Sequence, residues 1–178
     1  MNKKGFTLVE LLTAIIITGV LVAMAVPMYE KSVEKSRMAE VRVRLSKLFD
    51  AKMRVMSEWN MKNYDTTLTA ENLDVSFPCA GGATCTGTSF STDHFKYTLQ
   101  PTGNAPVSLR DGTGVSGAIG NTVCAVRRTG DNQGMALLYV GDLSNDATKR
   151  FFCHNGTSAK GCENIGMTPQ MGSAWCSL

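Results

Sequence analysis

Residues 11–29 contain no charged side chain, and this feature constrains the fold more than any other. As a helix, these 19 residues are roughly 28 Å long at 1.5 Å per residue. A bilayer core is about 30 Å thick, so the helix can span it. Lys3 and Lys4 precede the segment and are expected to stay in the cytoplasm. The sequence therefore predicts a membrane helix, with the following residues outside the cytoplasm.

Glu10 lies near the start of this segment. Three interpretations of the N-terminal segment are open, and they differ in whether they explain this carboxylate. A cleaved secretory signal requires a cut after the apolar run, and Ala23-Met24-Ala25 loosely fits such a site. A plain single-pass anchor is the second interpretation. Neither explains Glu10, because a charge deep in a bilayer costs about 2.5–3.5 kcal/mol and such a residue is by default a functional one.

The third interpretation rests on residues 3–10, which read Lys-Lys-Gly-Phe-Thr-Leu-Val-Glu. This string resembles the class III signal of prepilins in the type IV pilin and type II secretion pseudopilin family. The resemblance implies that a prepilin peptidase cuts between Gly5 and Phe6, that the new Phe6 amine is N-methylated, and that the apolar helix is retained. Loss of the leader removes two lysines, so the side-chain net charge falls from +3 to +1.

Cleavage would leave a positive amine at Phe6, four residues before the Glu10 carboxylate. Both charges would lie in an apolar fibre core, where they are costly unless they are paired. The resemblance implies that Glu10 meets the Phe6 amine of a neighbouring subunit and thereby sets the register of assembly.

Pro27 interrupts the helical pattern and predicts a kink, because proline removes one backbone hydrogen bond. The chain then becomes charged, and apolar residues recur at spacings of three and four, which predicts an amphipathic helix to about Lys62. The stripe comprises Val41, Leu45, Leu48, Phe49, Lys52, Met53, Met56 and Trp59. A helix from Phe6 to Lys62 would be roughly 85 Å long. Its first half would anchor the chain in the membrane, and its second half would pack in the globular domain that follows, here called the head.

The remainder predicts a small α+β head. Turn-forming residues dominate 63–93, which indicates a long connection. Four short β-like runs follow at residues 95–99, 122–127, 135–140 and 150–153. We expect a pilin-like lollipop fold: the long N-terminal helix packs on a roughly four-stranded antiparallel sheet in a disulfide-stapled head. The predicted segments are a leader (1–5), a membrane or fibre-core helix (6–29), an amphipathic helix (30–62), the connection (63–93), the sheet (94–153) and a C-terminal loop (154–178).

All six cysteines follow Pro78, which indicates disulfides and an oxidising compartment. The competing metal site is disfavoured because zinc sites usually contain tight Cys-x2-4-Cys pairs. Six cysteines allow 15 connectivities. The resemblance, in which the C-terminal loop is often locked to the sheet, favours one set: Cys79–Cys85, Cys153–Cys162 and Cys124–Cys176.

An enzyme is not expected, since His94 and His154 are the only histidines and no catalytic or phosphate-binding motif occurs. His154 beside Cys153 suggests a Cys–His site only if that cysteine is reduced. Asn155 begins a glycosylation sequon, which three loop residues often match by chance. The net charge of +3 is too small to indicate nucleic acid as the main partner. The one candidate basic patch for DNA comprises Arg127, Arg128, Lys149 and Arg150.

The predicted function is that of a structural pilin subunit, with a type II secretion pseudopilin as the alternative. The expected partners are further copies of the chain, a prepilin peptidase and methyltransferase, the inner-membrane assembly machinery and the membrane. No cofactor or metal is expected. The chain would cross the bacterial inner membrane once before assembly, and would afterwards lie in an extracellular pilus or a periplasmic pseudopilus.

Overall fold

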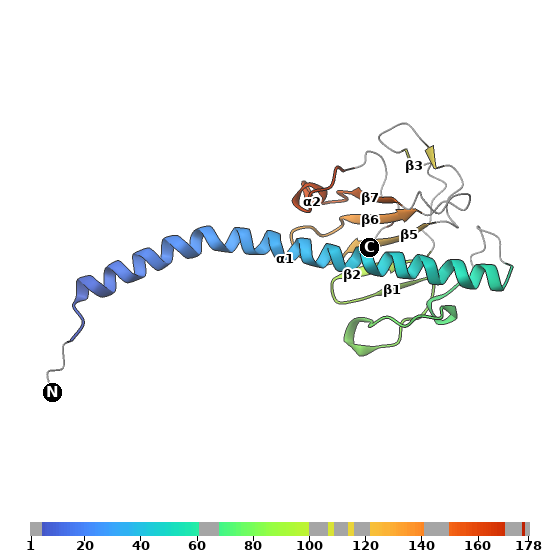
Figure 1. Cartoon of the computed structure of the whole chain (residues 1–178), viewed down its shortest axis with the longest axis horizontal. Coiled ribbons are helices and arrows are strands. Elements are labelled where there is room, and N and C mark those ends of the chain that lie inside the picture. The colour runs from blue at the N-terminus through green and yellow to red at the C-terminus, as the bar shows by residue number, and fades with distance from the viewer. Residues whose placement is uncertain are drawn as a thin grey trace. The chain divides into compact units, whose positions relative to one another are not determined.

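A computed structural model describes residues 5–60, 68–99, 107–108, 114–115, 122–140, 150–169 and 176. The chain divides into two compact units, Met1–Arg37 and Met38–Leu178, which are described separately. Helix α1 (Leu8–Glu58) supplies the described helical part of the first unit and the helix of the second (Figure 1).

The helix continues without interruption through Pro27. It ends at Glu58, short of the predicted end at Lys62. Asn60 adopts a positive φ of 51°, the left-handed conformation in which asparagine commonly terminates a helix. The predicted connection therefore begins earlier than expected.

The head contains a five-stranded antiparallel sheet in the order β1-β2-β5-β6-β7 (Figure 1). Its strands are β1 (Ser89–Ser91), β2 (Phe95–Thr98), β5 (Thr122–Arg127), β6 (Ala136–Val140) and β7 (Arg150–His154). The other elements are 3-10 turns η1 (Ala70–Asn72) and η2 (Ala80–Gly82), the separate pair β3 (Val107–Ser108) and β4 (Gly114–Val115), and helix α2 (Gly161–Asn164). The predicted α+β fold is confirmed.

Four strands were predicted, and β1 is the fifth strand of the observed sheet. It lies inside the segment 63–93 that was predicted to be a connection. It has only three residues, and Phe90 is the only fully buried one. Phe90 pairs with Tyr97 of β2, and their rings stack with centroids 5.5 Å apart. A strand this short has no run of alternating residues that would identify it in the sequence.

The stripe on α1 forms the head core with one face of the sheet. Val41, Leu45 and Leu48 are at most 1% exposed, and Phe49 contacts Tyr139 of β6 edge-on at 5.1 Å. Trp59 is the exception, with 50% of its surface exposed. It lies beyond the end of α1, where helical spacing no longer determines which side a residue faces.

The opposite face of the sheet is also buried. The residues on it are Cys124, Val126, Ala136, Leu138 and Val140, together with Cys176 from the C-terminal segment. All five residues of β6 are buried, and a continuous apolar strand is typical of a sheet covered on both faces. The predicted packing of the helix against the sheet accounts for the burial of one face only.

Candidate processing and assembly site

The beginning of α1 is organised by Thr7 and Glu10. The Thr7 N–H and hydroxyl donate to Glu10 Oε2 at 2.9 and 2.8 Å, and the Glu10 N–H lies 3.3 Å from Thr7 Oγ1. This is a capping box, in which the residue before the helix and its third residue satisfy each other's free donors. The Thr-x-x-Glu spacing of Thr7 and Glu10 is the sequence signature of such a cap.

Gly5 and Phe6 precede this cap. Both are exposed and lie outside regular secondary structure, and Phe6 is 89% exposed. Exposed chain that makes few contacts is the usual substrate of a peptidase. The Gly5–Phe6 bond is thus accessible, while α1 begins only two residues after Phe6.

The helix that follows is apolar around its whole circumference. Its exposed large apolar residues include Leu11, Ile15, Ile16, Ile17, Leu21, Val22 and Met28. A helix with this distribution requires burial in a membrane or against other helices. Among the described residues, α1 is the one helix long and apolar enough to cross a membrane.

Residues 1–26 match the family model of the prokaryotic N-terminal methylation motif. The chain therefore begins with an N-terminal methylation motif. This motif is the class III signal of type IV pilins and pseudopilins, and it supports membrane anchoring and a pilin-like or pseudopilin substrate of prepilin peptidase. No solved structure matches the chain.

Within the motif, Glu10 retains capacity to bind a cation. Its Oε2 is occupied by Thr7, while Oε1 accepts no hydrogen bond from the part of the chain that the structure describes. A carboxylate can accept about four hydrogen bonds. The arrangement therefore orients the carboxylate on the first turn and leaves one oxygen available for a further donor.

The head is cross-linked by three disulfides, Cys79–Cys85, Cys124–Cys176 and Cys153–Cys162. These pairs are those favoured by the resemblance. Cys153–Cys162 joins β7 to α2, and Cys124–Cys176 ties the C-terminal segment to central strand β5. Every cysteine is oxidised, so Cys153 does not form a Cys–His nucleophile with His154.

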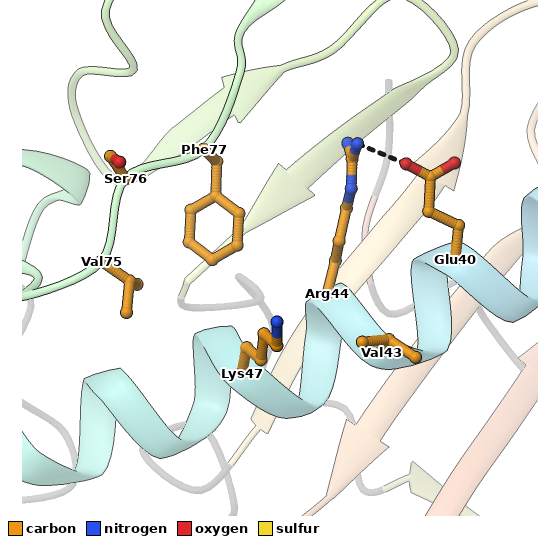
Figure 2. Close-up of a pocket in the computed structure, with 7 residues that line it drawn as sticks. All are labelled: Glu40, Val43, Arg44, Lys47, Val75, Ser76 and Phe77. Atoms are coloured by element: carbon orange, nitrogen blue, oxygen red, sulfur yellow. Dashed lines mark hydrogen bonds and ion pairs between the residues drawn. The ribbon is translucent and has the colours of Figure 1, made fainter.

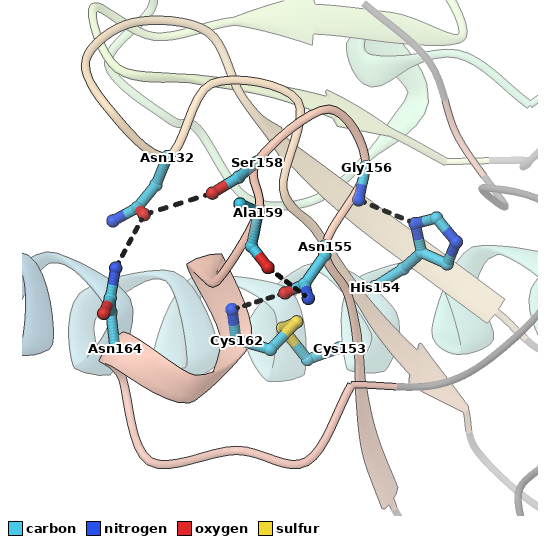
Figure 3. Close-up of a disulfide and its surroundings, with 9 residues drawn as sticks. All are labelled: Asn132, Cys153, His154, Asn155, Gly156, Ser158, Ala159, Cys162 and Asn164. Carbon is cyan, nitrogen blue, oxygen red and sulfur yellow. Dashed lines mark hydrogen bonds between the residues drawn. A yellow bond between two sulfur atoms is a disulfide. The ribbon is translucent and has the colours of Figure 1, made fainter.

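The loop around Cys153–Cys162 is fixed by amide side chains (Figure 3). Asn155 Oδ1 accepts from the Cys162 N–H at 2.8 Å, and its Nδ2 donates to the Ala159 carbonyl at 3.4 Å. The Asn164 amide donates to Asn132 Oδ1 at 3.3 Å, which connects α2 to the β5–β6 hairpin. The amide of the sequon asparagine therefore has a structural role.

The structure describes the side chains of two of the four residues in the predicted basic patch, and one of these two is buried. Arg127 is only 3% exposed, lies 5.0 Å above the Phe95 ring, and donates to the His94 carbonyl at 3.3 Å. Arg128 donates to the Thr92 carbonyl at 3.0 Å. Lys149 and the side chain of Arg150 lie outside the described residues. Dibasic pairs gave no sign that one arginine would be buried against an aromatic ring.

Lys52 is a buried basic residue within the apolar stripe of α1. Its Nζ donates to the carbonyls of Leu99 and Thr122 at 2.6 and 3.0 Å, and the side chain is fully buried. Burial lowers the pKa of Lys52 to about 7. A lysine within an apolar stripe at helical spacing was the available signal. Lys52 connects α1 to the end of β2 and the start of β5.

Proposed function

We propose that the chain is a structural pilin subunit that polymerises into a type IV pilus. The single observation that carries this proposal is the methylation motif on an apolar helix with an exposed Gly5–Phe6 bond. The three disulfides of the head support a location outside the cytoplasm, in an oxidising compartment, which agrees with this assembly.

In this proposal, cleavage between Gly5 and Phe6 creates a terminal amine, which is then methylated. The amine lies one residue before the capping threonine, and Glu10 lies on the first helical turn. Desolvation in a fibre core makes an unpaired amine or carboxylate unfavourable, so contact between Phe6 of one copy and Glu10 of another favours one register. The mechanism is assembly rather than catalysis, and Pro27 provides a position where α1 can bend during packing.

Intact-mass spectrometry of fibres sheared from expressing cells tests the proposal. The expected mass lacks residues 1–5, carries one methyl group, and gains six hydrogens when the three disulfides are reduced. Gly5→Leu is the control, because a side chain at Gly5 meets nothing within 4 Å and alters no folded contact. This variant should keep residues 1–5 and remain out of the fibre fraction.

Two other results separate the alternatives. A processed and methylated chain confined to the cell envelope indicates the type II secretion pseudopilin. A mass that retains residues 1–5 in the unmodified chain, or a cut near Ala25, contradicts both assignments and supports an ordinary anchor or secretory signal.

A further inference from the structure

An open groove of about 570 Å³ lies between α1 and residues 75–77. Val43, Val75 and Phe77 provide its apolar surface, and Arg44 and Lys47 contribute positive charge (Figure 2). Val43 is 56% exposed, although it lies on the part of α1 that contributes Val41 and Leu45 to the head core. The groove thus combines apolar surface with cations.

The wall opposite the helix is held on both sides of the groove. Arg54 donates two hydrogen bonds of 2.7 and 2.8 Å to the Asp74 carboxylate. The Phe77 ring stacks on Phe90 with centroids 5.8 Å apart. The Cys79–Cys85 disulfide follows directly. A wall fixed in this way loses little conformational freedom when a ligand binds, which favours recognition.

The two cations in the groove differ in their partners. Arg44 is paired with Glu40 one turn earlier on α1, whereas Lys47 forms no ion pair within the described ranges. The groove therefore offers an ammonium beside apolar side chains, and no carboxylate of the described residues is paired with it. The complementary ligand is a carboxylate with an apolar or aromatic neighbour.

Glu30 provides that chemistry on the same chain. Only two acidic residues occur between Leu11 and Arg37, and Glu34 is 8% exposed and pairs with Arg37. Glu30 is exposed, and the positions three and four residues away on its helix are Val26, Pro27, Val33 and Glu34. Because helical neighbours at these spacings are the ones that can pair, α1 offers Glu30 no cation. Tyr29, 71% exposed, supplies the adjacent aromatic ring.

We propose that the groove of one subunit binds Tyr29 and Glu30 of a second copy, with the Glu30 carboxylate on Lys47. The inference rests on the proposed polymerisation and adds a second charge contact to that of Glu10. For parallel helices, the contact between Glu30 and Lys47 requires an axial offset of 17 residues, or about 26 Å at 1.5 Å per residue. Burial between helices makes an unpaired Glu30 unfavourable, so this contact selects the offset.

A charge swap tests the contact in cells that carry the assembly machinery. Lys47→Glu and Glu30→Lys should each reduce sheared fibre at least tenfold, while processing and the disulfide-intact mass stay unchanged. The double variant should recover fibre to within about threefold of the unmodified chain. Lys160→Glu, which reverses an exposed head lysine outside the groove, is the matched control and should assemble normally.

The outcomes distinguish the contact from the function. Normal fibre yield in both single variants, or no recovery in the double variant while the unmodified chain assembles, overturns the groove contact and leaves the pilin assignment intact. If the unmodified chain is neither cut after Gly5 nor polymerised, the proposed function fails, and the contact fails with it. A variant that loses its disulfide-intact mass is replaced by Lys47→Gln and Glu30→Gln, each of which should lower fibre yield at least threefold; unchanged yield in both contradicts the contact.

Discussion

Replacing Lys52 by methionine should remove a specific pH dependence from the stability of the head. The side chain is buried against two carbonyls, and burial lowers its pKa from 10.5 to about 7. Below pH 7 the lysine is charged in both the folded and unfolded states, and the folded state bears the full cost of the buried charge. Between pH 7 and 10.5 the unfolded state binds a proton that the folded state lacks, so the free energy of unfolding rises with pH.

The size of this effect follows from the two pKa values. Each pH unit between them contributes about 1.4 kcal/mol, and the curve flattens near pH 7. The free energy of unfolding should therefore increase by about 2–3 kcal/mol between pH 6 and 9 in the unmodified chain relative to Lys52→Met. The variant also leaves two carbonyls without a donor, but this cost does not depend on pH. Only the difference in slope tests the reasoning.

Urea unfolding of the full chain in a mild non-ionic detergent, followed by near-ultraviolet circular dichroism, measures this slope. Burial raises the pKa of Tyr97 to about 12, which lowers stability above pH 10, so measurements should stop near pH 9.5. All six cysteines are paired, and no thiolate is present to start disulfide exchange at alkaline pH. Lys47→Met, an exposed lysine on the same helix, is the control and should follow the unmodified chain.

Parallel curves for the unmodified chain and Lys52→Met, separated by a constant to within about 0.5 kcal/mol, would refute the reasoning. They would mean that Lys52 keeps its charge in the folded state throughout this range.

Three further predictions concern assembly and the head. Glu10→Gln should be processed and methylated normally but yield at least tenfold less fibre, measured by intact mass and shearing; normal yield would contradict a register role. Serine replacement of Cys124–Cys176 should cost about 4 kcal/mol and that of Cys153–Cys162 about 3 kcal/mol, because the closed loops span 52 and 9 residues. Urea midpoints test this order, and the reverse order would show that loop entropy is not dominant. Leu45→Ala should cost about 2–5 kcal/mol, whereas Val43→Ala, at an exposed position, should cost under about 0.5 kcal/mol; equal losses would contradict the assigned core face.

Periodicity predicted the parts of the head in which one residue spacing persists. Val41, Leu45 and Leu48 repeat over several turns, so the buried face of α1 could be assigned before the structure. Strand β1 could not, because three residues contain too little alternation. The apolar β6 run did contain a signal for a sheet buried on both faces, but Cys176, the described residue that joins the sheet residues on the second face, is distant in sequence.

The candidate site divides in the same way. The residues around Gly5 and Glu10 are contiguous, so a short string of sequence was sufficient to indicate the motif. The groove is different because α1 and residues 75–77 approach each other only after folding. In the sequence, nothing distinguishes Lys47 from other solvent-exposed lysines on a helix. Its place in a groove depends on Phe77, which folding brings to the opposite wall. The role of Arg127 was misjudged for a related reason, since its ring partner Phe95 lies 32 positions earlier on a neighbouring strand.

The distribution of stabilising contacts along the chain separates folding from assembly. All three disulfides lie in the unit Met38–Leu178, as do the apolar core and Lys52. The unit Met1–Arg37 contains the methylation motif, Glu10 and Glu30, whose charges have their proposed partners on other copies. Substitutions at distant sites without shared partners change stability additively. Combining Glu10→Gln with Leu45→Ala should therefore lower head stability by no more than Leu45→Ala alone, to within about 0.5 kcal/mol. A larger loss would show that Glu10 contributes to the folding of the single subunit as well as to the contact between subunits.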